Sequence, residues 1–481
     1  MIGNLKMLKK KIFVCLYVHI SIIVGFLLCL FIEYYTTNFF SSALLLNLSI
    51  YIYVWICYSA HLIGYKYSHP YFLFLYAFLG FILWNNVTTF VGITNYWDGY
   101  FSLGEEYYRK EYVHNQTYVA VILSMLFFHL IAIVMGGEQK TFLSLKSIAY
   151  SSNKIRFFQN NSYTLYWIFY PLYVIYILYL VYYVMTLGYM SLFGEDSFKP
   201  PLILGLADDC ARTFFWIYVL TKPPKDKLRK VVLSYSILLC LALLKGGRGA
   251  VFCEFLAFLP LFEYLGKEIP LKKIILIGGA ILILSPVIFY IRLGQDISER
   301  DESILKAIVS QQGVSIATVS AAIVHENDLP RCNQVYLLGP LVEFKDYLFE
   351  RLSGSNAQLT SPEKLPKLSQ IMSFLVDRKA YYNGWGFGSS YIAEFYIFGG
   401  FTGVAFLSLA FMGFLLRMFQ ERESFFILFF AFISIKAIVF SLRDNPFAII
   451  VSSFFPIIIY FCFYLYYNIC EHENINNHTC L

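Results

Sequence analysis

The chain has 481 residues, of which 58% are hydrophobic and only 14% are charged, and its mean hydropathy is +0.61. A water-soluble globule could not bury so much apolar surface, so these values exclude a soluble protein and predict one embedded in lipid. The formal net charge of +6 is spread over short basic runs between apolar segments and forms no clustered patch. We therefore expect no nucleic-acid partner.

The N-terminus has a basic run followed by an apolar stretch from Ile12 to Ile32. Its charge pattern is that of a signal sequence, but the apolar stretch is too long for one and no small-residue cleavage site follows. We expect a retained first membrane span.

Apolar stretches of about 20 residues, the length that crosses a bilayer as a helix, recur along the whole chain. They lie at 12–32, 42–63, 71–91, 117–136, 164–187, 202–220, 231–245, 249–265, 274–291, 391–416, 425–441 and 448–467. This pattern predicts an all-α, polytopic membrane protein with about 12 transmembrane helices. The stretches 231–245 and 249–265 are short and close together, so a re-entrant or tilted pair is an alternative there.

The distribution of Lys and Arg predicts the orientation of these spans, because cytoplasmic loops carry an excess of both. With the N-terminus inside, the predicted cytoplasmic segments hold 19 Lys and Arg residues, whereas the short outside loops hold 6. The asymmetry favours both the span assignment and a cytoplasmic location for both termini.

Residues 293–390 form a long segment without a predicted span, and the assignment places it outside. Within it, Ile304 to Val324 is moderately apolar with a polar stripe, which suits a helix that lies on the membrane or dips into it. The chain thus divides into an N-terminal transmembrane bundle at 1–292, this large loop, and C-terminal spans with a short cytoplasmic tail at 391–481.

Three arginines lie at predicted outside ends of spans, where the charge rule disfavours them: Arg248, Arg292 and Arg443. Such positions are functional candidates, and the fixed fork of a guanidinium suits a diphosphate better than lysine does. The glycines that flank the first arginine would let the backbone approach the same anion; they are Gly246, Gly247 and Gly249. The alternative for each arginine is an ordinary pair with a lipid phosphate or a neighbouring acid.

Several acids and one histidine could carry proton transfer. His325, in the long outside loop, could act as a general base or as a donor to a sugar, although a solvated loop histidine is the more common outcome. Glu394 lies early in the span after that loop, where a carboxylate is costly, and it could orient an arginine or form a structural pair. Weaker candidates in the second outside loop are Asp98, Glu105 and Glu106.

Familiar catalytic and metal-binding motifs are missing from the sequence. We find no HExxH, GxSxG, Walker or DxD motif at a credible position, and the 10 cysteines are scattered without paired spacing. We therefore expect no metal and no cofactor.

Three short stretches resemble the O-antigen (Wzy-type) polysaccharide polymerase family, which includes the related enterobacterial common antigen polymerases. They are GGRGAVF at 246–252, GFGSSYIAEFYIFGGFTGVAF at 386–406 and SLRDNPFAII at 441–450. The arrangement of many spans around one large periplasmic loop is similar along nearly the whole chain.

The resemblance implies a GT-C-like enzyme of the bacterial inner membrane whose active site faces the periplasm. Its substrates would be undecaprenyl-diphosphate-linked oligosaccharide repeat units, with the growing chain moving from its lipid diphosphate onto the incoming unit. A chain-length regulator and a flippase would be partners in the same membrane. Departure of a diphosphate requires fixed cations, which Arg248, Arg292 and Arg443 could supply. The candidates for the general base are His325, Glu394 and Asp444, which the sequence does not rank.

Three alternatives remain open from the sequence. An O-antigen ligase would share the span count, the long loop and the lipid-diphosphate donor, but would deliver glycan to lipid A core. A lipid-linked oligosaccharide flippase would have uniformly short loops, whereas this chain concentrates polar residues in one long outside loop. A non-catalytic membrane scaffold is the third.

Overall fold

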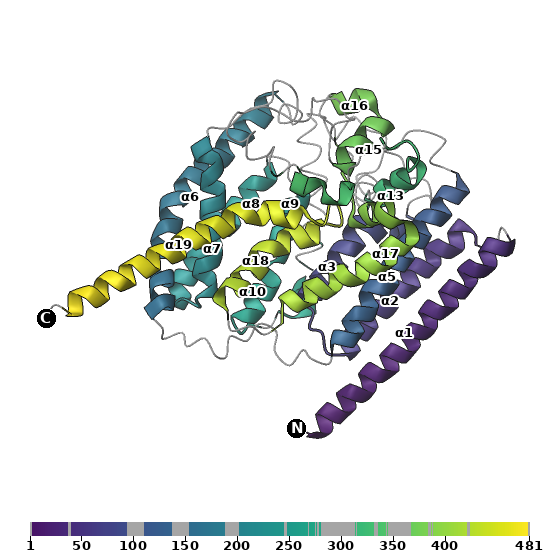
Figure 1. Ribbon diagram of the computed structural model, residues 1–481, viewed down its shortest axis with the longest axis horizontal. Coiled ribbons are helices and arrows are strands. Elements are labelled where there is room, and N and C mark those ends of the chain that lie inside the picture. The colour runs from purple at the N-terminus through teal and green to yellow at the C-terminus, as the bar shows by residue number, and fades with distance from the viewer. Residues whose placement is uncertain are drawn as a thin grey trace.

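The computed structural model is a bundle of long helices that lie side by side (Figure 1). All secondary structure in the described part of the chain is helical. That part comprises residues 2–36, 40–93, 110–136, 153–187, 202–244, 248–267, 269–274, 276, 279, 313, 315–330, 335–342, 344, 367–382, 386, 388–420 and 424–479.

The helices before the long loop are α1 (Ile2–Thr36), α2 (Ser42–Leu62), α3 (Pro70–Phe78), the π-helical turn η1 (Leu79–Leu83), α4 (Trp84–Phe90), α5 (Glu111–Gly136), α6 (Asn153–Leu187), α7 (Leu202–Leu220), α8 (Lys225–Leu244), α9 (Arg248–Leu256) and α10 (Phe258–Tyr264). Those in and after it are α13 (Ser315–Val324), the 3-10 turn η6 (Tyr336–Leu338), α15 (Leu368–Val376), α16 (Arg378–Tyr382), α17 (Tyr391–Met418), α18 (Phe425–Phe440) and α19 (Ala448–Thr479).

Helix boundaries follow local sequence signals. Ser41 caps α2, because its hydroxyl oxygen accepts the backbone N–H of Leu44 at 3.2 Å. Pro70 occupies the first turn of α3, where its missing N–H costs nothing. Ser390 caps α17 by accepting the N–H of Ile392 at 3.3 Å.

Seven of the described helical stretches are long and apolar enough to cross a membrane. They are Met7–Tyr35, Ser42–Leu62, Pro70–Phe90, Glu111–Gly136, Asn153–Leu187, Tyr391–Met418 and Ala448–Glu471. Each coincides with a predicted span, so the chain is a multi-pass membrane protein. Helices α7, α8, α9 with α10, and α18 match four further predicted stretches but are shorter or more charged. The stretch 274–291 lies almost wholly outside the described residues, and the count of 12 and the GT-C-like architecture stay predictions.

The segment Tyr391–Met418 differs from the single straight span that its hydropathy predicts. The backbone leaves helical geometry at Gly399 and Gly400, and Gly400 has a φ of 60°, which favours glycine. The rings of Tyr391 and Phe411 stack with centroids 5.7 Å apart, whereas 20 residues of continuous helix would separate them by about 30 Å. The first two turns of α17 therefore fold back against the rest of the helix.

Part of the long loop also enters the bundle. Helix α13 is buried along its whole length except for its last residue, and it packs against α5, α17 and η1. The N–H of Gly313 donates to the carbonyl of Gly80 at 3.0 Å, within the π-helical turn of the third span. The hydroxyls of Thr117 and Ser320 form a hydrogen bond of 2.9 Å. This geometry favours a segment that dips into the bundle over one that lies on its surface.

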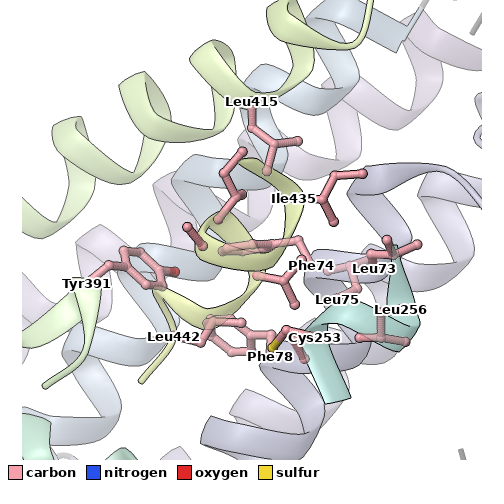
Figure 2. Packing of buried hydrophobic residues seen from close by; sticks show 14 of the residues in the cluster. Leu73, Phe74, Leu75, Phe78, Cys253, Leu256, Tyr391, Leu415, Ile435 and Leu442 are labelled. Carbon is pink, nitrogen blue, oxygen red and sulfur yellow. The ribbon is translucent and has the colours of Figure 1, made fainter. Parts of the chain in front are cut away.

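Helix α18 lies in the centre of the core. Figure 2 shows side chains of α3, α9 and α17 gathered around it, among them Phe74, Leu256 and Leu415. Its 16 residues rise only about 24 Å, less than the roughly 30 Å of a bilayer's hydrocarbon core. Helix α18 by itself is therefore too short to cross the hydrocarbon core.

Candidate functional site

The turn between α18 and α19 comprises residues 441–447 and is fixed by its own hydrogen bonds. The carboxylate of Asp444 accepts the N–H of Asn445 at 2.8 Å, and the side-chain oxygen of Asn445 accepts the N–H of Phe447 at 2.8 Å. Asn445 thus starts α19 in the manner of a helix cap. Within this fixed turn the side chain of Arg443 is exposed.

The glycine-rich segment before α17 is hydrogen-bonded to this turn. The N–H of Ser389 donates to the carbonyl of Arg443 at 3.3 Å, and the N–H of Tyr391 donates to the carbonyl of Ser441 at 2.9 Å. Gly388 has a φ of 80°, and a Cβ there would lie 3.4 Å from the Arg443 carbonyl oxygen. Two of the three stretches that carry the family resemblance therefore form one structural unit.

Glu394 lies beneath this unit. It is 1% exposed, and its Oε1 accepts the hydroxyl of Ser389 at 2.8 Å. Glu394 also interacts electrostatically with the carboxylate of Asp444 and through a hydrogen bond with the side chain of Asn445. The structure thus connects Glu394 to the two loops through Ser389, and its burial keeps it from direct contact with a substrate in this conformation.

Two parts of the long loop contact the same turn. The side-chain amide of Asn445 donates to the carbonyls of Tyr336 at 3.3 Å and Leu337 at 3.2 Å. Asp444 is half-buried, and burial raises the pKa of its carboxyl, against the opposing effects of the Asn445 N–H and the positive charge of Lys367. Lys367 is a residue that the sequence did not single out.

The first turn of α9 packs against the last turn of α18. A Cβ on Gly249 would lie only 2.8 Å from the ring of Phe440 and 3.7 Å from that of Phe81. A glycine is therefore needed here for close helix packing. This contact brings the backbone of Arg248, the first residue of α9, to the end of α18 that leads into Arg443.

Other predicted site residues lie outside the described part of the chain: Arg292, Gly246, Gly247, the side chain of Arg248, and the weaker candidates Asp98, Glu105 and Glu106. Their roles stay predictions.

His325 follows the end of α13 and is tied to its own neighbourhood. Its Nδ1 lies 2.8 Å from the carboxylate of Asp328, which is largely exposed. The next residue, Glu326, accepts the hydroxyl of Tyr396 from α17 at 3.0 Å. This segment therefore contacts the folded-back turns of α17.

A group of charges inside the bundle was not predicted from the sequence. Glu254 on α9 and Lys436 on α18 form an ion pair of 2.8 Å, and Arg212 on α7 lies within electrostatic range of Glu254. Each is a charged residue inside an apolar stretch, which is the signal that could have revealed them. Among the residues described here, no group of three or more His, Cys, Asp or Glu is arranged to hold a metal ion.

These features define a multi-pass helical membrane protein in which loops from distant parts of the chain converge on an arginine and an aspartate. Residues 17–474 match the family described as O-antigen polysaccharide polymerase Wzy, and the chain belongs to that family. The searches of curated proteins and of solved structures give no match.

Family membership establishes the activity. The protein is a membrane polymerase that joins O-antigen repeat units, acting on lipid-linked oligosaccharides.

Proposed function

We propose that this polymerase transfers the growing polysaccharide from undecaprenyl diphosphate to a hydroxyl of the incoming lipid-linked unit. The bond between the anomeric carbon and the diphosphate oxygen breaks, and the lipid diphosphate leaves with the bonding electrons. The acceptor oxygen forms the new glycosidic bond and loses its proton to a base. The observation that supports this most is the hydrogen-bonded unit of residues 388–391 and 441–445, which presents Arg443 and Asp444 side by side.

The cations stabilise the leaving group. Negative charge develops on the diphosphate as the bond breaks, and fixed donors act most strongly where water is partly excluded. Arg443 is exposed at the turn, and the backbone of Arg248 starts a helix packed against the end of α18. Arg292 belongs to the same proposal on sequence grounds alone.

Asp444 is our choice for the general base. Its side chain is half-buried next to Arg443, so a hydroxyl can reach it, whereas Glu394 is 1% exposed. Burial also raises the pKa of Asp444, which makes the carboxylate a stronger base than a solvated aspartate. Glu394 then supports the turn through Ser389, and His325 contacts the acceptor sugar from the α13 end.

The proposed location is the periplasmic face of the bacterial inner membrane. The excess of Lys and Arg in the loops at the other ends of the helices, 19 against 6, supports it. A flippase that delivers the unit and a chain-length regulator complete the proposed assembly. A reporter fused near Ser355 that works only outside the cytoplasm is expected to be active, and a fusion active only in the cytoplasm contradicts the orientation.

The decisive experiment uses purified protein in lipid nanodiscs with a synthetic undecaprenyl-diphosphate-linked repeat unit. Wild-type protein is expected to produce dimers and longer chains and to release undecaprenyl diphosphate. Failure to extend this donor, together with transfer onto lipid A core, would favour a ligase.

A further inference from the structure

The ion pair between Glu254 and Lys436 is unequal in its exposure. Its atoms Oε2 and Nζ are 2.8 Å apart, and the side chains are 5% and 32% exposed, respectively. The other oxygen of Glu254 accepts the hydroxyl of Tyr235. The carboxylate is thus buried and hydrogen-bonded through both oxygens, while the lysine side chain keeps accessible surface.

Glu254 does not depend on Lys436 alone for its charge. Arg212 also interacts electrostatically with Glu254. The Nη2 atom of Arg212 lies 3.6 Å from the carboxylate of Asp209 and donates to the carbonyl of Ser452 at 3.1 Å. Asp208 is a third acid within range of Arg212. A buried carboxylate needs a partner, but this one has a cation and a phenol besides the lysine.

Lys436 lies close beneath the candidate site. It is four residues before the end of α18, or about 6 Å along the helix axis from Phe440. Lys436 and Arg443 are both close enough to interact electrostatically with the thiol of Cys253, which lies one turn along α9 from Gly249. The ammonium therefore belongs to the same end of the bundle as Arg443 and the start of α9.

A lysine inside a membrane bundle whose side chain is 32% exposed requires acceptors for its ammonium group. A lysine has three N–H donors, and Glu254 is its one hydrogen-bonding partner among the residues that the structure describes. The residues on either side of Lys436 in α18 are buried, since Ile435 is 1% and Ala437 9% exposed. A cation at membrane depth with unused donors is the arrangement expected of a binding group for an anion.

We propose that Lys436 is a further substrate-binding residue, oriented by Glu254, that holds the lipid-proximal phosphate of the polyprenyl diphosphate. This inference rests on the proposed lipid-diphosphate donor. The prenyl chain enters the hydrocarbon core, so the phosphate attached to it lies deeper than the phosphate attached to the sugar. Lys436 is correspondingly deeper than Arg443, which meets the sugar-bound phosphate where the bond breaks.

The two phosphates differ in what happens to them. No bond to the lipid-proximal phosphate changes during transfer, so a contact to it stabilises the bound substrate and the transition state alike. Loss of such a contact raises KM and leaves kcat nearly unchanged, whereas loss of an arginine at the departing oxygen lowers kcat.

The test compares two variants in which the ion pair is already broken. Glu254→Gln keeps the ammonium and leaves an amide oxygen to orient it, and Glu254→Gln with Lys436→Met removes the charge without leaving a lone buried ion. Undecaprenyl diphosphate without sugar is the probe, measured for binding to each purified protein in nanodiscs. We expect Glu254→Gln to bind with an affinity close to wild type, and the double variant to bind roughly 10- to 100-fold more weakly. KM is expected to follow the same order at nearly constant kcat.

A matched control is the ion pair between Lys66 and Glu263, 3.2 Å apart, for which Lys66→Met with Glu263→Gln should not change the affinity. Equal binding by Glu254→Gln and the double variant, with both proteins folded, would overturn the proposal and leave Lys436 a structural partner. If the double variant does not fold, Lys436→Arg and Lys436→Gln are compared in the Glu254→Gln background, where no ion pair remains. The arginine must keep most of the affinity and the glutamine must lose it, and equal binding by the two overturns the proposal. Absence of binding by wild-type protein would instead refute the lipid-diphosphate donor itself.

Discussion

Two polar regions lie inside the helix bundle, one among α1, α2, α3 and α5 and the other around the end of α18. In the first, His19 and His129 are both 0% exposed, and their rings meet edge to face with centroids 4.8 Å apart. In the second, Arg443 is exposed, Asp444 is half-buried and Lys436 is 32% exposed.

The histidine region uses all of its ring nitrogens internally. His129 forms hydrogen bonds with the hydroxyls of Ser59 and Tyr71, both at 2.6 Å. His19 forms hydrogen bonds with the carbonyl of Leu126 at 2.8 Å and with the indole N–H of Trp55 at 3.3 Å. A closed and satisfied network of this kind holds helices together but offers nothing to a ligand.

Polarity within a membrane bundle therefore does not by itself mark a functional site. What separates the two regions is the accessible surface that their polar side chains keep, because an enclosed and satisfied group offers nothing to a ligand. By that criterion we propose the region around α18 as the site and the histidine region as structural. Substitutions in the two regions should therefore have different effects.

Asp444→Asn is expected to give the largest loss, about 100- to 10,000-fold in rate, because it removes the proposed general base. Activity requires the carboxylate, and burial raises the pKa of this group above the ordinary 3.8, so wild-type activity should fall as pH drops through that raised pKa. The measurement is kcat/KM against pH in the nanodisc assay. If Asp444→Asn retained wild-type rates and showed the same decrease in kcat/KM at low pH, Asp444 would be excluded as the base.

Arg248→Ala should abolish long polymer, since loss of one donor to a developing anion costs about 100- to 1,000-fold in rate. Lipopolysaccharide from such cells should show core bearing a single repeat unit, at normal protein level and membrane insertion. Arg229→Ala, an exposed arginine near the other end of α8, is the matched control and should give normal chains. Normal chain lengths from Arg248→Ala would remove the residue from the mechanism, and loss of the single unit would point to a ligase.

Arg443→Lys should be nearly as damaging as Arg443→Ala, because a point charge does not replace the bidentate fork of a guanidinium on a diphosphate. Polymer length on gels and kcat in vitro measure the effect. If lysine restored most of the polymer, Arg443 would act through its charge alone, and the geometry of the 441–447 turn would matter less than we propose.

His129→Ala should have the smallest effect on turnover. It removes the partner of the Tyr71 hydroxyl, whereas the Ser59 hydroxyl keeps the Trp55 carbonyl at 2.7 Å, and the loss costs about 1–2 kcal/mol of stability in a membrane bundle. We expect a lower thermal unfolding temperature and an unchanged kcat per folded molecule. A loss of kcat comparable to that of Arg443→Lys, at a temperature where the variant is folded, would break the distinction between the two regions.

Part of the candidate site can be proposed from the sequence. Arg248 and Arg443 stand out because arginines are disfavoured at those ends of spans, and the stretches 386–406 and 441–450 point to one family. The structure adds that 388–391 and 441–445 are hydrogen-bonded to each other. Sequence spacing cannot reveal that contact, because the helices between them set it.

The sequence by itself determined that the chain lies in lipid, where its long helices run and which family it belongs to. Composition and local hydropathy are sufficient for this, since a bilayer requires about 20 apolar residues for each helical crossing. The spans at 12–32, 42–63 and 117–136 follow that rule and coincide with helices in the structure.

The assembly of the candidate site follows from the packing of the helices, which local sequence does not determine. Hydropathy averages apolar residues and is insensitive to the φ of Gly400, so it could not predict that the first turns of α17 fold back. The same averaging hid Glu254 and Lys436, whose pairing depends on the packing of α9 against α18. The choice of Asp444 over Glu394 depends on which carboxylate remains accessible, and accessibility is a property of the packed bundle because every neighbouring helix contributes to it.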